Sequence, residues 1–308
     1  MEPTHSSGLV LSADLTAQGL GPGEIRRAVR DNDLTRVRRG AYVPATAWNS
    51  ARPESRYRYL VHATVAATRT PVVLSHESAA VLHGFPRIGS WPTVVHAVRE
   101  RTTGGRSSTT VIRHGVPRMP EVVTVDGLHT TSVARTVIDL ARTSSFLNGV
   151  VAADHVLANG LATREELEVS LLDVRRMHGH RRAERVLRFA DGRAQSVGES
   201  LSRVRMHELR LPVPDLQVEF RDAAGFVARV DFWWERFRLV GEFDGRGKYV
   251  PGDADPRLDT SEIVYREKLR EDRLRRLVSA VVRWGWAEVW NRELFAGTMA
   301  RAGLHSER

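Results

Sequence analysis

The chain has 308 residues, of which 42% are hydrophobic and 27% are charged, as expected of a soluble globular protein with two or three domains. It contains no cysteine, which excludes disulfides, a thiolate nucleophile and cysteine-ligated zinc. The net charge of +9 agrees with a polyanionic partner. The sequence predicts no signal peptide, and none of its apolar runs is long enough to cross a bilayer, so a cytoplasmic protein without membrane contact is expected.

Lysine is rare in this chain. Lys248 and Lys268 are the only lysines among the 46 basic residues. A lysine that persists among so many arginines is expected where a compact ammonium with an adjustable pKa is needed. Lys268 is spaced to pair with Asp272 on the exposed side of a helix, which leaves Lys248 as the lysine with a predicted chemical role.

The N-terminal segment has the order helix, turn, helix and basic hairpin. Leu9–Gln18 and Pro22–Asn32 are predicted helices, with a proline at the start of the second. The alternating stretch Leu34–Pro44 predicts two strands that turn at Arg39-Gly40. This order is typical of a winged helix-turn-helix, and the alternative is a small helical cap with a solvated arginine face.

A winged domain would carry its DNA contacts on the second helix and on the hairpin. Six arginines at these positions are the predicted DNA-binding residues: Arg26, Arg27, Arg30, Arg36, Arg38 and Arg39. The stretches Glu24–Arg30 and Leu34–Pro44 resemble the N-terminal domain of AbiEi-type abortive-infection antitoxins. The resemblance implies a winged DNA-binding domain over residues 1–48, a transcriptional repressor that binds its own promoter, and a cognate toxin as a partner.

The middle region, residues 49–190, mixes helices and strands and predicts an α+β scaffold. Predicted helices are Arg56–Thr68, a helix after Val72–Leu74, a helix opening at Thr130, Phe146–Ala158 and Thr163–Arg176; predicted strands are Thr93–Val98, Thr110–His114 and Val122–His129. A linker is expected around His178–Arg193, with a helix over Ala183–Phe189 as the alternative within it. A hydrolase triad is disfavoured because His76 directly follows Ser75. Structural roles are therefore predicted for His76, His83, Arg135 and Asp139.

The C-terminal region, residues 191–308, contains three closely spaced carboxylates. Phe226–Trp234 and Phe237–Phe243 alternate as two adjacent strands. A two-residue turn between them sets Asp231 opposite Val240, with Glu242 diagonal on the same face and Asp244 two residues further on. Acids on such strands need a partner, so a divalent metal held by Asp231 and Glu242 is predicted. Oxygen ligands favour magnesium, with manganese as the alternative.

A helix is predicted over Thr260–Val278. Ile263, Leu274, Leu277 and Val278 form one apolar stripe, which places it against the strands. Glu267 and Arg270 fall on the same side and are predicted to support the acidic site.

The C-terminal region resembles the PD-(D/E)xK nuclease superfamily, and most closely its Vsr-like endonuclease-related domains. The resemblance rests on Gly198–Ser200, Gln217, Arg229–Phe232, Glu242–Tyr249, Arg266–Arg273 and Val282–Trp284. It implies a restriction-endonuclease-like mixed sheet flanked by helices. It also implies metal ligation by Asp231 and Glu242, a supporting acid in Glu199, a supporting amide in Gln217, and a metal-bound water held by Asp244.

The sequence departs from the superfamily at one position. Asp244 stands where the lysine of the usual Glu-x-Lys pattern is expected, and Lys248 is predicted to take over that role. The predicted catalytic set is therefore Glu199, Asp231, Glu242, Asp244 and Lys248, acting through a metal-activated water.

Taken together, the sequence predicts an α/β (α+β) protein with three regions. Its predicted function is that of a DNA-binding, magnesium-dependent endonuclease, a phosphodiester hydrolase linked to defence or toxin–antitoxin biology. The alternative is a non-catalytic AbiEi-like antitoxin, a transcriptional regulator whose nuclease fold is degenerate. A further alternative is an inert α/β domain with surface acids.

Overall fold

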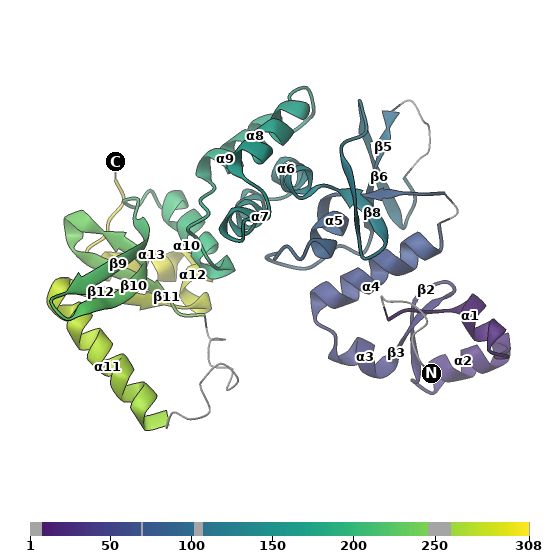
Figure 1. The fold of residues 1–308 in the computed structure, drawn as a ribbon, viewed down its shortest axis with the longest axis horizontal. Helices are drawn as coiled ribbons and strands as arrows, with labels where there is room; N and C mark the ends of the chain where they lie inside the picture. Colours follow the sequence, from purple (N-terminus) through teal and green to yellow (C-terminus); the bar gives the residue numbers. More distant parts are fainter. Residues whose placement is uncertain (1–7, 69, 102–106, 246–259, 308) are drawn as a thin grey trace. The chain divides into compact units, whose positions relative to one another are not determined.

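The structure is a computed structural model that describes residues 8–68, 70–101, 107–245 and 260–307, with the side chains of residues 260–268 left aside. The chain divides into two compact units (Figure 1). The first unit comprises residues 1–156 and 160–189, and the second comprises residues 157–159 and 190–308. Each unit combines helices with a β-sheet, which confirms the predicted α/β (α+β) class.

The first unit begins with a small sheet next to two short helices. The elements are β1 (Val10–Leu11), α1 (Ser12–Ala17), α2 (Pro22–Arg30), β2 (Leu34–Arg38) and β3 (Ala41–Pro44), with sheet order β1-β3-β2. The predicted hairpin turns at Gly40, whose φ of +78° suits glycine. Val10, Leu15, Ile25 and Leu34 form the buried core between helices and sheet. The predicted order of two helices and a basic hairpin is present.

The rest of the first unit contains a five-stranded mixed sheet with order β6-β5-β4-β8-β7. The strands of this sheet are β4 (Val73–Leu74), β5 (Val95–Glu100), β6 (Val111–Val116), β7 (Val122–Val125) and β8 (Leu128–Thr131). The helices in this part of the chain are α3 (Ala45–Ser50), α4 (Pro53–Ala66) and α5 (His76–Leu82). The single strand predicted over Val122–His129 is wrong. Asp126 and Gly127 both have positive φ and close a tight hairpin between β7 and β8.

Four helices complete the first unit: α6 (Val133–Thr143), α7 (Phe146–Ala158), α8 (Arg164–Asp173) and α9 (His180–Phe189). A capping box begins α8, because Thr163 Oγ1 accepts from the Glu166 backbone N–H and the Glu166 carboxylate accepts from the Thr163 backbone N–H. Most of the stretch predicted as a linker is the regular helix α9. The division between the units follows directly after it, between Phe189 and Ala190.

The second unit places a four-stranded mixed sheet between helices. Its elements are α10 (Val197–Glu208), β9 (Asp215–Asp222), β10 (Gly225–Trp234), β11 (Leu239–Phe243), α11 (Thr260–Leu277), β12 (Ala280–Trp284), α12 (Trp286–Trp290) and α13 (Arg292–Arg301). The sheet order is β12-β11-β10-β9, and β12 is the strand that runs parallel to its neighbour. After β12 the chain forms two helices, α12 and α13.

The predicted register between β10 and β11 is wrong. A short 3₁₀ helix (Glu235–Phe237) and Arg238 in a left-handed conformation join the strands, in place of a two-residue turn. The longer connection pairs Trp233 with Val240. Continued by two residues, this register sets Asp231 directly opposite Glu242, on the same face as predicted but without the diagonal offset.

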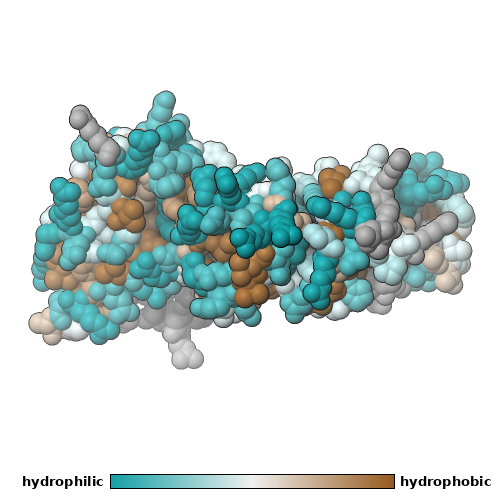
Figure 2. Space-filling model, turned by 90° about the horizontal axis from the view of Figure 1, so that it is seen from above, coloured by the Kyte–Doolittle hydropathy of each residue, from teal (hydrophilic) through white to brown (hydrophobic). Residues whose placement is uncertain are grey.

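The apolar core of the second unit lies between the sheet and α11. Val230 and Val240 from the strands pack with Leu274 of the helix and with Val278, which directly follows it. Both belong to the predicted apolar stripe, of which Ile263 lies outside the described side chains. On the molecular face shown in Figure 2, hydrophobic side chains appear as small patches among hydrophilic ones. In the described part of the chain, no helix is both long and apolar enough to cross a membrane.

Candidate nucleic-acid interface and acidic site

The candidate nucleic-acid interface consists of the exposed arginines of α2 and of the β2–β3 hairpin. Burial of Ile25 in the core fixes α2 so that its arginines point outward. Five exposed side chains form this set: Arg26, Arg27, Arg30, Arg36 and Arg39. Within the described residues none of the five makes a side-chain hydrogen bond or ion pair. Their guanidinium donors are therefore available to phosphate oxygens.

Arg38, the sixth predicted DNA-binding residue, is placed differently. Its Nε donates to Thr64 Oγ1 at 3.2 Å and its Nη2 donates to the Thr93 carbonyl at 3.1 Å. Burial lowers the pKa of Arg38 below its usual value. The residue therefore ties the hairpin to α4 and to the segment before β5, and its donors face the protein. The cause is the bulge between Arg36 and Arg38, which shifts the register of the hairpin there.

The candidate acidic site of the second unit is built around Glu199. This carboxylate is 5% exposed and lies in the first turn of α10. Oε1 accepts from Ser196 Oγ at 2.8 Å, and Oε2 accepts from the Gln195 backbone at 2.9 Å. Oε2 also accepts from Gln217 Nε2 at 3.0 Å. Three donors thus satisfy a buried acid, as burial of a charge requires.

Gln217 joins Glu199 to Asp231. Its Nε2 donates to Asp231 Oδ1 at 3.2 Å, while Asp231 Oδ2 accepts from the Phe243 backbone at 3.0 Å. Gln217 has a φ of +54°, a conformation that costs a non-glycine residue free energy. Three of the residues predicted from the sequence, on α10, β9 and β10, are therefore brought together, although nothing in the structure tests a catalytic role for them.

Close packing of α10 against β11 positions this cluster. A Cβ added at Gly198 would lie 1.9 Å from Cε1 of Phe243. Any larger residue would therefore push the first turn of α10, and with it Glu199, away from the strand.

Glu242 is held by arginines. Its Oε2 accepts from Arg283 Nε at 2.8 Å, and Arg270 Nη2 lies 4.0 Å from Oε1. The hydrogen bond to Glu242 raises the pKa of Arg283. The parallel register of β12 sets Arg283 beside Glu242, and this pairing is not readable from the sequence. Arg270 therefore lies next to Glu242, and its predicted role of supporting a catalytic site stays a prediction.

The positions of the acidic side chains can be compared with the predicted metal site. Among the residues that the structure describes, no three acidic or histidine side chains are arranged to hold a metal ion. Two predicted members, Lys248 and the side chain of Glu267, lie outside the described residues. Magnesium or manganese at this site therefore stays a prediction.

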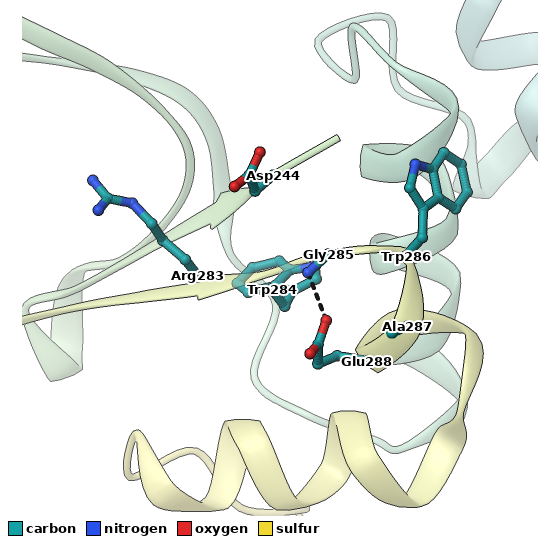
Figure 3. A pocket seen from close by; sticks show the side chains of 7 residues that line it. All are labelled: Asp244, Arg283, Trp284, Gly285, Trp286, Ala287 and Glu288. Carbon is teal, nitrogen blue, oxygen red and sulfur yellow. Dashed lines mark hydrogen bonds between the residues drawn. The ribbon is translucent and has the colours of Figure 1, made fainter. Parts of the chain in front are cut away.

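Asp244 directly follows β11 and lines a pocket of about 390 Å³. Its backbone N–H donates to the Trp284 carbonyl at 2.8 Å, and its side chain is exposed. Figure 3 shows this carboxylate with the Arg283 guanidinium on one side and the Trp286 indole on the other. Glu288, which also lines the pocket, accepts from the Gly285 backbone at 2.9 Å (Figure 3). The acidic site therefore adjoins a solvent-accessible pocket with a cation and an exposed aromatic ring.

Sequence reasoning missed a buried histidine cluster in the first unit. His96 Nδ1 lies 2.9 Å from His114 Nε2, and His76 stacks on His114 with ring centroids 3.7 Å apart. Burial lowers the pKa of His114 to about 4 and the pKa of His76 well below its usual value. His96 and His114 meet through the parallel pairing of β5 and β6, and His76 reaches them from the first residue of α5. No sequence spacing signals that pairing.

Comparison with known families finds AbiEi antitoxin domains in the first unit. Residues 5–45 match the family described as "Transcriptional regulator, AbiEi antitoxin". Residues 71–189 match the "AbiEi antitoxin C-terminal domain", which covers the five-stranded sheet and the helices α6 to α9. The resemblance of the N-terminal segment is therefore confirmed, and both matched ranges end before the acidic site.

Curated relatives come from Mycobacterium tuberculosis. "Uncharacterized protein Rv2248" of strain H37Rv and "Uncharacterized protein MT2308" of strain CDC 1551 are each 34% identical over 120 residues. The match covers 39% of this chain and 44% of each relative, so the chain spans less than half the length of these proteins. A solved structure, "Crystal structure of RV2827C protein from Mycobacterium tuberculosis", aligns with a TM-score of 0.34 at 16% identity, covering 59% of this chain and 76% of that one.

Proposed function

We propose that this protein is a DNA-binding transcriptional regulator of the antitoxin type. The main support is a single observation. Residues 5–45, which match a transcriptional regulator family, include five exposed arginines without partners among the described residues. In the proposed complex α2 enters the major groove and the β2–β3 hairpin lies along the phosphate backbone. Arg26, Arg27 and Arg30 then act from the helix, and Arg36 and Arg39 act from the hairpin.

The proposed partners follow from the same matches. The DNA site is the promoter of the protein's own gene, and the protein partner of the regulatory system is a cognate toxin. The AbiEi antitoxin C-terminal domain at residues 71–189 supports the second assignment. The net charge of +9 supports association with the DNA polyanion.

Fluorescence anisotropy with the full-length protein tests the proposal. One labelled duplex carries the sequence upstream of the gene, and a second carries the same bases in scrambled order. We expect tighter binding to the first duplex and an affinity that falls steeply with salt, because phosphate contacts release counterions. Equal affinity for both duplexes, or no binding to either at low salt, contradicts a promoter-binding regulator.

Phosphodiester hydrolysis by the second unit is a second candidate function. It is favoured by the hydrogen bonds that link Glu199, Gln217 and Asp231, the residues that carry the nuclease resemblance. The test is incubation of supercoiled, single-stranded and mismatched DNA with the protein and either magnesium or manganese. Cleavage that is lost in both Asp231→Ala and Glu242→Ala would support it. Intact DNA under every condition would leave the second unit a non-catalytic fold.

A further inference from the structure

Two adjoining hollows in the first unit form one groove. One hollow, of about 490 Å³, lies between the start of α6 and α8. The other, of about 500 Å³, lies between residues 116–121 and the C-terminal end of α8. Pro120, Glu121, Arg135 and Asp173 line both hollows, so the two are continuous.

Apolar side chains line this groove and reach solvent there. The lining includes Met119, Pro120, Val133, Leu161, Val169 and Met177. Leu161 is 44% exposed and Val169 is 61% exposed, and Leu172, three residues after Val169, is 67% exposed. Single exposed apolar side chains are ordinary on a protein surface. A group of them beside a hollow is typical of a surface that binds a partner.

The sequence of α8 explains why these side chains are not buried. Leu167 in the helix and Val174 directly after it are fully buried and hold one face of α8 against the core. Val169 follows Leu167 by two residues, about 200° further around the helix, so it lies on the opposite face. Glu165 and Leu172 share this outer face, because they are four residues before and three residues after Val169.

Carboxylates border the apolar side chains. Four exposed acids line the groove: Glu121, Glu165, Glu166 and Asp173. Among the described residues, Glu121 and Asp173 make no side-chain hydrogen bond or ion pair. Elsewhere in this arginine-rich chain, exposed acids such as Glu184 and Glu208 pair with an arginine. Asp173 is also the last residue of α8, where a negative charge opposes the helix dipole.

The basic residues of the lining do not neutralise this border. Arg118 is exposed on the side of residues 116–121 and is a single charge against four. Arg135 is buried, and its guanidinium donates to Asp139, which lies outside the groove lining. The groove therefore combines an apolar surface with an acidic border.

This combination selects among partners. Nucleic acid and anionic lipid head groups are repelled by the carboxylates. A small polyamine would pair with the carboxylates but would leave Leu161 and Val169 in water. A protein segment whose apolar side chains are flanked by arginine or lysine satisfies both parts of the groove.

The first unit already contains one helix of this chemistry. On α9 the buried residues include Ala183, Val186 and Leu187, and the exposed ones are Arg181, Arg182, Arg185 and Arg188. This helix packs against both α6 and α8, and Arg164 of α8 donates to the Leu187 carbonyl at 3.0 Å. The two helices that border the groove therefore already hold one cationic amphipathic helix by its apolar face.

We propose that the groove is a docking surface for a cationic amphipathic helix of a partner protein. The apolar face of the partner packs on Leu161, Val169 and the start of α6, and its basic side chains pair with Glu121 and Asp173. The groove shares no residue with the arginine surface of α2 and the β2–β3 hairpin, so this proposal does not depend on DNA binding.

Isothermal titration calorimetry on the full-length protein tests the groove with a designed peptide of about 18 residues, long enough to form a helical face. Leucines occupy one face at helical spacing, and lysines flank them. Two control peptides carry glutamine or glutamate in place of every lysine. We expect saturable binding of the lysine peptide, weaker binding of the glutamine peptide and none of the glutamate peptide. No saturable binding of the lysine peptide, or equal affinity for all three, would overturn the proposal.

Two matched variants locate the peptide. Val169 and Val213 are both exposed, so a lysine at either position should leave the thermal unfolding midpoint unchanged. Each variant adds one positive charge, but only Val169→Lys adds it in the groove. We expect Val169→Lys to weaken binding of the lysine peptide at least about tenfold and Val213→Lys to leave it close to the wild type. Equal affinity in the two variants would overturn the proposal.

A second pair of variants tests the acidic border. Glu121→Gln combined with Asp173→Asn removes two charges from the groove, and Glu235→Gln combined with Glu307→Gln removes two from exposed positions in the second unit. We expect the first double variant to bind the lysine peptide about fivefold more weakly or less, and the second to match the wild type. Equal affinity in the two double variants would remove the role of the carboxylates and overturn the proposal.

Sedimentation velocity of the protein alone tests whether a second copy of the chain fills the groove. We expect the same sedimentation coefficient for the wild type and for Val169→Lys. An oligomer of the wild type that dissociates in Val169→Lys would make the groove a contact between copies and overturn the assignment to a partner protein.

Discussion

The N-terminal arginine surface and the C-terminal acidic site use the same side chain in opposite ways. In the first, five exposed arginines keep their donors free within the described part of the chain. In the second, Arg283 and Arg270 are directed at Glu242, and Arg273 is directed at Asp222. Free guanidinium groups on a rigid frame are suited to an external anion, whereas paired ones hold the fold.

The contrast teaches that net charge alone does not locate a nucleic-acid interface. The charge of +9 is a property of the whole chain, and arginines are abundant in both units. What distinguishes the N-terminal surface is the absence of acidic partners among its described neighbours. A loss of arginines there should affect binding and leave stability unchanged, while changes at the acidic site should affect stability first.

The largest effect is expected from Arg26, Arg27 and Arg30 replaced together by glutamine. Three charged hydrogen bonds to phosphate would be lost, so we expect DNA affinity to fall about 100-fold or more at moderate salt. The slope of log affinity against log salt should become less negative by about 3. Fluorescence anisotropy across a salt series measures both quantities, and thermal unfolding should be unchanged.

A matched triple variant controls for charge. Arg188, Arg221 and Arg275 are exposed arginines that pair with Glu184, Glu219 and Glu271. Their replacement by glutamine removes the same three charges from other surfaces. We expect little change in DNA affinity. If this control variant lost as much DNA affinity as the α2 variant, the binding would depend on the net charge of the protein and not on the proposed interface.

At the acidic site, Gly198→Ala should mainly destabilise the second unit. The new Cβ would collide with the ring of Phe243, which is buried and cannot move aside without shifting β11. Overpacking of this kind costs about 3 kcal/mol, measurable by chemical denaturation. DNA binding through the first unit should persist. A variant as stable as the wild type would show that the close contact between Gly198 and Phe243 is not needed to position Glu199.

Arg36 and Arg38 allow an arginine without protein partners to be compared with a hydrogen-bonded one in a single hairpin. Arg38→Gln removes hydrogen bonds to Thr64 and Thr93, and we expect it to lower the free energy of unfolding by about 1–2 kcal/mol. Arg36→Gln should change stability by less than about 0.5 kcal/mol, because the side chain is exposed. Its DNA affinity should fall about fivefold to tenfold with the loss of one phosphate contact. The distinction between free and paired arginines would fail if both variants lost only DNA affinity.

The sequence predicts those parts of the fold that local pattern determines. The hairpin turn at Arg39-Gly40, the cap at Thr163 and the apolar stripe of α11 all follow from residue type and spacing. Gln217 donates a hydrogen bond to Glu199, so these two residues of the predicted site lie together, while their role in it stays a prediction.

Long-range pairing accounts for what the sequence does not predict. The positions of Arg283 beside Glu242 and of His96 beside His114 both depend on the register of parallel strands, which carries no short-range signal. The register of β10 and β11 also differs from the predicted one, because the four residues Glu235–Arg238 join these strands in place of a two-residue turn. These four residues contain neither the glycine nor the asparagine that marks a two-residue hairpin.

The smallest expected effect concerns Asp222, the partner of Arg273. Hydrogen bonds from this guanidinium lower the pKa of Asp222 from 3.8 to about 2. Because the folded-state pKa is depressed, the pair contributes stability above pH 3.8, and that contribution is lost as the pH falls through about 2. In Arg273→Gln the pKa of Asp222 should rise toward 3.8, which NMR titration of its carboxyl carbon measures. Arg275→Gln, two residues away and paired with Glu271, should leave that titration in place. If the pKa of Asp222 stays near 2 in both variants, the guanidinium of Arg273 does not pair with this carboxylate. Pairing with acids would then not distinguish the arginines of the second unit from those of α2.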